Sequence, residues 1–253
     1  MCKKTAFFCH FSLSLLVVGT VLAIVFLLWY PGFYFRVLGT MDVLKAFIGV
    51  NLALGPVLTL ILYKPNLLVD IYMIAAIQLA ALVYGVSVIY QERPYYAVFS
   101  VDRFEILAER DVDLSNVPDS ERFEKPWGQP LVVFANLPTD PEARNRIIHE
   151  TLLEGKPDIH RRPELWSSYD ERADDVISRA RPLARLRESR PDIADEITAL
   201  MERYDNADQL VFVPIMGKKH VFSLVLDAQS KHPLEIIDAD PWDIPAALAR
   251  DSG

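Results

Sequence analysis

Cysteine is almost missing from this chain of 253 residues. Its two cysteines, Cys2 and Cys9, both fall within the first nine residues, so the rest of the chain has no thiol for a disulfide or for nucleophilic catalysis. We interpret the pair as ordinary reduced thiols. Cys9 precedes the first apolar run instead of following it, which argues against a lipoprotein anchor.

Charge is equally scarce in the first third of the chain. Residues 1–90 carry five basic and two acidic side chains, a net charge of +3, whereas residues 91–253 carry 21 Lys and Arg against 32 Asp and Glu, a net charge of −11. So sharp a change predicts a membrane region, 1–92, followed by a soluble region, 93–253. The soluble region is long enough for one compact domain.

Catalytic signatures are also missing. The sequence has no Gly-rich phosphate loop, no Gly-x-Ser-x-Gly and no His-Glu-x-x-His, and its five histidines show no metal-ligand spacing. Asp238–Asp243 contains the Asp-x-Asp found in some glycosyltransferases, but a solvated turn in an acidic tail explains this lone tripeptide better. We therefore expect no catalytic residue, no metal and no cofactor, and a protein that is not an enzyme.

Three apolar runs are long enough to cross a bilayer. Phe11–Trp29 is nineteen residues without a charge, close to the length that spans a hydrocarbon core of roughly 30 Å. A signal peptide cleaved near Val21–Ala23 is the alternative, but the run continues to an aromatic edge at Trp29-Tyr30, as in a membrane anchor. We predict helices at about 11–30, 43–62 and 70–90, joined by a loop at 31–40 and a tight turn at 63–70.

The placement of Lys and Arg predicts the orientation. Lys3, Lys4 and Lys64 fall on one side of the predicted membrane, and Arg36, with Lys45 near the edge of its segment, falls on the other. This distribution favours a cytoplasmic N-terminus, so three crossings place the soluble domain in the periplasm of a Gram-negative bacterium.

The second apolar run holds residues that a plain anchor does not need. At about 100° per residue, Gly49, Leu52 and Pro56 share one helix face with Lys45 and Asp42, whereas Asn51, Gly55 and Thr59 share another. Lys45 can snorkel or pair with Asp42. Asn51 lies deeper, so we expect its amide to bond to a neighbouring helix or to backbone freed by Pro56.

The third run offers a matching seam. Gln78, Leu82 and Gly85 lie on one face, flanked by Ala75 and Ala81, so small residues permit close approach and an amide supplies a hydrogen bond. Packing within a three-helix bundle and a groove for a fourth, foreign helix both fit this pattern.

The soluble region reads as one α+β domain. Strands are predicted within Arg93–Leu107 and Pro130–Leu137, in a hairpin around Gly217–Lys219, and shortly before the end of the chain. Thr139 or Asp140 caps a helix that stops at Gly155, and residues 164–204 look helical with breaks at prolines. Strands at both ends with helices between them are typical of this class.

Five arginines fall between Ser178 and Arg190. Binding of nucleic acid is disfavoured, because the domain is acidic overall and acidic residues flank the run on both sides. A solvated helix face is the simplest interpretation, and contact with lipid head groups or with an acidic protein surface remains open.

Three blocks, GPVLTLILYKP (Gly55–Pro65), QLAALVYGV (Gln78–Val86) and RPYYAVFSVDRFE (Arg93–Glu105), closely resemble the type IV pilin accessory proteins of the TfpX/TfpZ type, which are related to fimbrial assembly proteins. The resemblance is strong over residues 40–105 and loose over 110–205. It implies a multi-pass inner-membrane protein with a three-helix transmembrane bundle and one α+β periplasmic domain. Its expected role is that of an accessory or chaperone-like factor for a cognate type IV pilin.

The resemblance also implies the partners: the cognate major pilin, inner-membrane lipids and other pilus assembly proteins, with no nucleic acid. A salt bridge from Lys45 to the acidic residue typical of pilin helices is disfavoured, because the two lie toward opposite leaflets. A membrane-bound enzyme that modifies pilin, for example by glycosylation, is the alternative function. The candidate partner-binding residues are Lys45, Gly49, Asn51, Gly55, Pro56, Gln78, Gly85, Arg93, Asp102 and Arg103.

Overall fold

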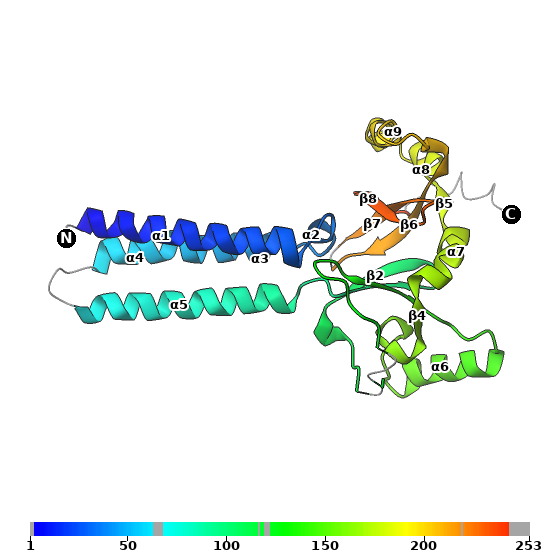
Figure 1. The fold of residues 1–253 in the computed structure, drawn as a ribbon, viewed down its shortest axis with the longest axis horizontal. Coiled ribbons are helices and arrows are strands. Elements are labelled where there is room, and N and C mark those ends of the chain that lie inside the picture. Colours follow the sequence, from blue (N-terminus) through cyan, green and yellow to red (C-terminus); the bar gives the residue numbers. More distant parts are fainter. Residues whose placement is uncertain (1–2, 63–67, 116, 119–121, 219, 243–253) are drawn as a thin grey trace. The chain divides into compact units, whose positions relative to one another are not determined.

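The computed structural model describes residues 3–62, 68–115, 117–118, 122–218 and 220–242 (Figure 1). The chain divides into two compact units. The first comprises Met1–Arg93 together with Trp127–Gln129, and the second comprises Pro94–Pro126 and Pro130–Gly253. We describe each unit by itself.

The first unit is helical, and three of its helices, Lys4–Trp29, Met41–Ile61 and Tyr72–Gln91, are long and apolar enough to cross a membrane. Their presence confirms the three predicted apolar helices, although the first begins earlier than expected. The elements in chain order are α1 (Lys3–Ile24), η1 (Val25–Trp29), α2 (Tyr34–Val37), α3 (Met41–Ile48), η2 (Gly49–Leu54), α4 (Gly55–Leu62) and α5 (Leu68–Gln91).

The link between the first two long helices is more ordered than the predicted loop. It contains the short helix α2, whose Tyr34 and Val37 are buried. Gly32 and Gly39 bracket it with positive φ angles of 57° and 61°, which glycine adopts readily because it has no Cβ. The aromatic and aliphatic side chains of this link therefore pack instead of facing water. The tight turn predicted around Pro65-Asn66 lies outside the described residues.

The second long helix changes its winding in the middle. The segment η2 is π-helical, and it ends directly before Gly55-Pro56. Proline has no N–H to donate and its ring crowds the carbonyl of the preceding turn, so a wider turn before Pro56 relieves that crowding. The Gly-Pro pair thus produces a local π-helical segment between α3 and α4.

The second unit is built on a mixed sheet with the strand order β4-β3-β1-β2-β6-β7-β8, and β5 pairs with β6 off this path. The pairs β1–β3 and β2–β6 are parallel, and the other pairs are antiparallel. The strands are β1 (Tyr96–Ser100), β2 (Arg103–Leu107), β3 (Leu131–Ala135), β4 (Trp166–Ser168), β5 (Arg181–Pro182), β6 (Leu210–Met216), β7 (Val221–Asp227) and β8 (Pro233–Ile237).

The helices of the second unit lie between strands in the chain, as predicted. Asp140 caps α6, accepting a hydrogen bond from the Ala143 amide at 3.0 Å, and Gly155 follows the helix with a φ of 70°. Residues 164–168 differ from the predicted helix, because they form a short 3-10 turn and then β4, with Trp166 buried. The helices are α6 (Pro141–Leu153), α7 (Tyr169–Arg179), α8 (Leu183–Ser189) and α9 (Ala194–Met201), with 3-10 turns η3 (Glu109–Asp111), η5 (Ile159–Arg161), η6 (Pro163–Leu165), η7 (Pro191–Ile193) and η8 (Ala207–Gln209).

One face of the sheet carries two separate apolar clusters. The first gathers side chains of β1, β2 and β3 under α6 and η5, including Val98 and Ile147. The second gathers side chains of β6, β7 and β8 under α8 and α9, including Phe212 and Leu186. The register places both on the same face, because Glu105 pairs with Met216 across β2 and β6 and side chains alternate along each strand.

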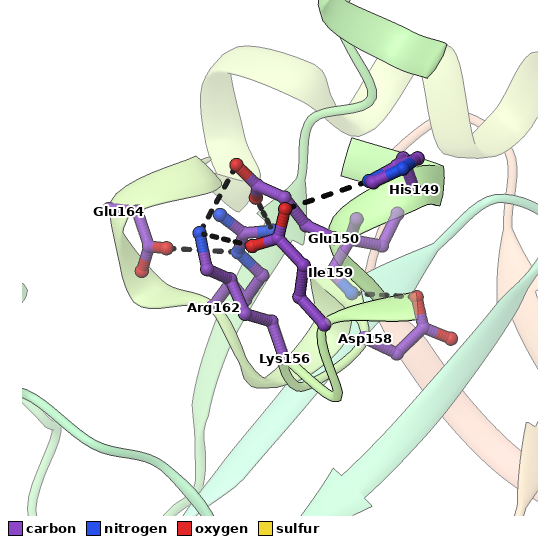
Figure 2. A network of polar contacts seen from close by, with 8 residues as sticks. His149, Glu150, Lys156, Asp158, Ile159, Arg162 and Glu164 are labelled. Atoms are coloured by element: carbon purple, nitrogen blue, oxygen red, sulfur yellow. Dashed lines mark hydrogen bonds and ion pairs between the residues drawn. The ribbon is translucent and has the colours of Figure 1, made fainter. Parts of the chain in front are cut away.

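A network of ion pairs ties α6 to the loop that follows it (Figure 2). The Arg162 guanidinium donates to Glu150 at 2.8 Å and to Glu164 at 3.0 Å, and the Lys156 ammonium lies 3.2 Å from Glu150. Hydrogen bonds from Arg162 and Lys156 hold the pKa of the Glu150 carboxyl below its usual value. The network therefore fixes the position of η5 and η6, which cover the first apolar cluster.

Candidate helix-binding groove

The two predicted faces of the second long helix have different surroundings. Asn51, Gly55 and Thr59 are buried, whereas Gly49 is exposed and lies with Leu52 and Pro56 on an apolar groove. Asn51 and Gly55 therefore pack within the bundle. Gly49 lies where a further helix could reach it, and Pro56, although largely buried, lines the same groove.

The inner face is held together by Gln78 from α5. Its Nε2 donates to the Asn51 carbonyl at 3.0 Å and to the Ser14 hydroxyl of α1 at 3.2 Å, so one amide joins all three long helices. A Cβ added to Gly55 would lie 2.1 Å from Gln78 Oε1, much closer than real Cβ contacts allow. Glycine at residue 55 is thus what lets the amide cross the bundle.

Asn51 satisfies its own side chain differently from the prediction. Its Nδ2 donates to the Phe47 carbonyl, four residues earlier in the same helix, at 2.9 Å. The partner is neither another helix nor the turn at Pro56, because the π-helical winding begins between Phe47 and Asn51 and lets the side chain reach that carbonyl. Gly85 packs closely as well, since an added Cβ would lie 2.6 Å from the Phe47 ring.

The outer face forms a groove of about 300 Å³ between α1 and the second long helix. Figure 1 shows α1 running alongside α4, in agreement with the contacts between α1, η2 and α4. On the α1 side, the Phe7 and Phe11 rings are stacked, with centroids 6.1 Å apart. The lining residues are Phe7, Phe11, Ile48, Gly49, Leu52, Ala53, Pro56 and Val57.

The groove has the chemistry of a helix-packing surface. Its lining is wholly apolar, and Gly49 and Ala53, four residues apart, are small and exposed. Small residues at this spacing let a second backbone approach closely, which matters in a bilayer because helix association there depends on van der Waals packing. A Cβ added to Gly49 would meet nothing within 4 Å, so the space above it is open.

A second groove, of about 190 Å³, lies between α1 and α5. It is lined by apolar residues together with His10, Ser14, Asn51 and Gln78. Each of these side chains makes a hydrogen bond within the bundle; His10 Nδ1, for example, lies 2.6 Å from the Thr59 hydroxyl, although Gln78 Oε1 has no partner among the described residues. Its polar lining therefore makes it less suited to an apolar helix than the first groove.

Two charged candidates of the first unit have different settings. Lys45 is exposed and forms no ion pair with another described residue, which agrees with a snorkelling side chain. Arg93 follows α5, where its guanidinium donates to the Tyr90 carbonyl at 2.9 Å and lies 3.7 Å from the centroid of the Tyr90 ring. Tyr90 in turn packs edge-on against Trp29, so Arg93 helps to close the helix end.

Asp102 and Arg103 lie at the tip of the β1–β2 hairpin. The Arg103 guanidinium bonds to Glu105 at 3.1 Å and lies 5.5 Å from the Trp242 ring. The register places Arg103 and Glu105 on the sheet face that carries the two apolar clusters, on the strand β2 that pairs with β6. The titratable group His160 lies nearby; burial lowers its pKa, although Glu105 opposes that shift.

Sequence reasoning missed the α1 side of the groove and the hairpin tip. Phe7 and Phe11 are four residues apart, a spacing that puts both on one helix face, but the first helix was expected to begin only at residue 11. Val101 sits in a two-residue hairpin loop with a φ of 58°. A hairpin this tight usually carries Asn, Asp or Gly, so Asp102 was the available signal and the valine beside it concealed the turn.

Three helices of spanning length joined to a mixed α/β sheet define a membrane-associated protein with one globular domain. No family model matches the chain, and no solved structure matches it. Two curated relatives from Dichelobacter nodosus, the fimbrial assembly proteins of serogroups I and E1, are each 27% identical over 245 residues, covering 93% of this chain and 94% of the relative.

A third relative, the fimbrial assembly protein of serogroups C1 and C2 from the same organism, is 34% identical over 116 residues, covering 44% of this chain and 88% of the relative. The chain belongs to the family of fimbrial assembly proteins. The resemblance noted in the sequence is thereby confirmed.

Proposed function

We propose that the protein is an inner-membrane accessory factor for type IV fimbrial assembly. It holds the transmembrane helix of its cognate pilin in the groove between α1 and the second long helix, and its second unit contacts the soluble head of the pilin. The observation that carries this proposal is an apolar groove lined by Gly49, Ala53 and Pro56 on the outside of a bundle of spanning helices. The relatives are named fimbrial assembly proteins, which supports a role of this protein in fimbrial assembly.

The groove suits transient binding. In a bilayer, lipid tails are as apolar as leucine, so a docked helix gains shape complementarity and dispersion contacts without a strong hydrophobic driving force. A groove of about 300 Å³ without hydrogen-bonding side chains can therefore hold a pilin helix and release it again. In this proposal the N-terminus is cytoplasmic and the sheet domain is periplasmic, beside the pilin head.

The decisive variant is Gly49→Leu, with Gly19→Leu as its matched control. Both glycines are exposed positions within long helices, and an added Cβ meets nothing within 4 Å at either one, so neither leucine clashes inside the bundle. Only Gly49 lines the groove. We expect Gly49→Leu to reduce surface pili severalfold and to abolish cross-linking between a photoreactive residue at Val57 and the pilin helix.

Gly19→Leu should leave pilus number and cross-linking unchanged. The proposal fails if both variants behave like the wild type at equal membrane levels, or if both lose pili equally. Intact-mass measurement of pilin from a deletion strain tests the absence of catalysis. An unchanged pilin mass is expected, and a shifted mass would replace the binding role with an enzymatic one.

A further inference from the structure

Four of the five arginines between Ser178 and Arg190 form no ion pair with a carboxylate of the described residues. The fifth, Arg190, bonds to Asp192 at 2.7 Å, and the other four are Arg179, Arg181, Arg185 and Arg187. Acidic residues outnumber basic ones in this part of the chain, 32 to 21 over residues 91–253. Guanidinium groups that are not paired with a carboxylate contribute a local positive field at the surface of this acidic domain.

Two of these arginines are fixed in place by backbone carbonyls. Arg179 Nη1 donates to the Val101 carbonyl at 2.6 Å, and Arg181 Nη1 donates to the Pro241 carbonyl at 3.4 Å. A carbonyl orients a guanidinium without neutralising its charge. Each side chain keeps further N–H donors for a carboxylate and has already lost part of its rotamer freedom.

Exposed apolar groups lie beside the same arginines. Val101 is 54% exposed at its φ of 58°, a conformation that is strained for a β-branched residue. Trp242 is 39% exposed, directly follows the carbonyl that binds Arg181, and lies over the Arg103 guanidinium. Arg179 contacts the end of the β1–β2 hairpin at Val101, and Trp242 lies beside Arg103 at the same hairpin end. Together with Arg181, these residues form what we call the arginine–tryptophan surface: Val101, Arg103, Arg179, Arg181 and Trp242.

We propose that the arginine–tryptophan surface binds a carboxylate-bearing segment of a partner protein. The identity of the partner rests on the proposed function, which makes it the soluble head of the cognate pilin. Trp and Arg are the residue types that most often dominate protein–protein binding energy, and Arg matches a carboxylate with two parallel hydrogen bonds. The unpaired charges also speed encounter with an acidic surface.

The local charge pattern favours a protein over an anionic membrane. Glu105 bonds to Arg103 at 3.1 Å, Asp102 lies at the hairpin tip, and Asp240 accepts a hydrogen bond from the Trp242 amide. These carboxylates repel a broad sheet of lipid phosphates. They leave room for single acidic side chains directed at Arg179 and Arg181.

The test measures binding of purified full-length pilin to the full chain in nanodiscs of zwitterionic lipid. The variant is R179E/R181E and the control is R144E/R146E on α6. The two pairs match closely, because Arg144, like Arg179, is exposed and donates to backbone carbonyls, those of Pro138 and Thr139. We expect R179E/R181E to raise the Kd about tenfold or more at low salt, with a smaller change in 0.5 M NaCl, and R144E/R146E to stay within about twofold.

The neutral variant R179Q/R181Q tests the same surface without introducing negative charges that could disturb folding. We expect it to bind pilin with about threefold weaker affinity. The proposal for this surface would be refuted if both Arg179/Arg181 variants bound pilin with wild-type affinity, or if R144E/R146E lost as much affinity as they do. If those variants bind pilin normally while Gly49→Leu does not, the proposed role of the groove is supported and the proposed role of the arginine–tryptophan surface is refuted. If the wild-type protein does not bind pilin, both proposals are refuted. Loss of binding to anionic vesicles with pilin binding intact would assign the arginines to lipid.

Discussion

The substitution Gly55→Ala should disturb the inner packing of the helix bundle and leave the lining of the outer groove unchanged. Gly55→Ala places a Cβ 2.1 Å from Gln78 Oε1, so the amide has to move away and lose its hydrogen bonds to Asn51 and Ser14. Interhelical hydrogen bonds in membranes contribute about 0.6 kcal/mol on average and up to about 1.7 kcal/mol. Losing two of them therefore destabilises the bundle by about 1–3 kcal/mol.

Gly49→Ala is the control on the same helix. Its Cβ meets nothing within 4 Å, and alanine has the higher helix propensity, so we expect no loss of stability or a slight gain. The assay is unfolding of the full chain in mixed micelles with a rising fraction of denaturing detergent, followed by tryptophan fluorescence. The midpoint should fall for Gly55→Ala only.

A double-mutant cycle identifies the cause. If the collision with Gln78 destabilises Gly55→Ala, then adding Gln78→Ala removes the collision, and the double variant should be no less stable than Gln78→Ala alone. Additive losses, or equal midpoints for Gly55→Ala and Gly49→Ala, would refute the view that residue 55 is glycine to admit the amide.

Three further outcomes concern the second unit. Val101→Asn should raise its free energy of unfolding by about 1 kcal/mol, measured by thermal unfolding, because asparagine tolerates a positive φ better than valine. Burial lowers the pKa of His160 below its usual value, so the unfolded chain binds the proton more readily, and stability falls as the pH drops below about 6.5, the usual pKa of an exposed histidine. His160→Asn should flatten this loss in melting curves recorded between about pH 7.5 and about pH 5. Arg162→Gln should return the pKa of Glu150 toward its usual value in a carboxyl NMR titration, and an unmoved pKa would contradict the role given to the ion-pair network.

Periodicity was enough to predict the faces of the second helix. The spacing of Asn51, Gly55 and Thr59 put them on one side, and all three are buried, because a helix that packs in a bundle must present its small and polar residues to its neighbours. Periodicity could not predict the hydrogen-bond partner of Asn51, since that depends on local π-helical winding, nor that the groove would have Phe7 and Phe11 as its other side.

In the second unit, the strands followed from their Val, Ile and Phe content, whereas their order did not. The two parallel pairs join segments far apart in the chain, and no local pattern encodes which strands become neighbours. Arg179 and Val101 illustrate the same limit. Their sequence separation is large, and only the fold brings the guanidinium to the carbonyl of a strained hairpin.

The pairing of β2 with β6 has a consequence for how the chain matures. Phe104 finds Ile215 as its neighbour only after more than a hundred further residues have been made. Until then, β2 of the nascent β1–β2 hairpin has an unpaired edge that can pair with a strand of another chain. Contacts between such distant segments also form slowly, which prolongs this exposure. Chains that are truncated anywhere before β6 should therefore aggregate. The pairing of β6 with β2 thus protects the first hairpin of this domain from aggregation.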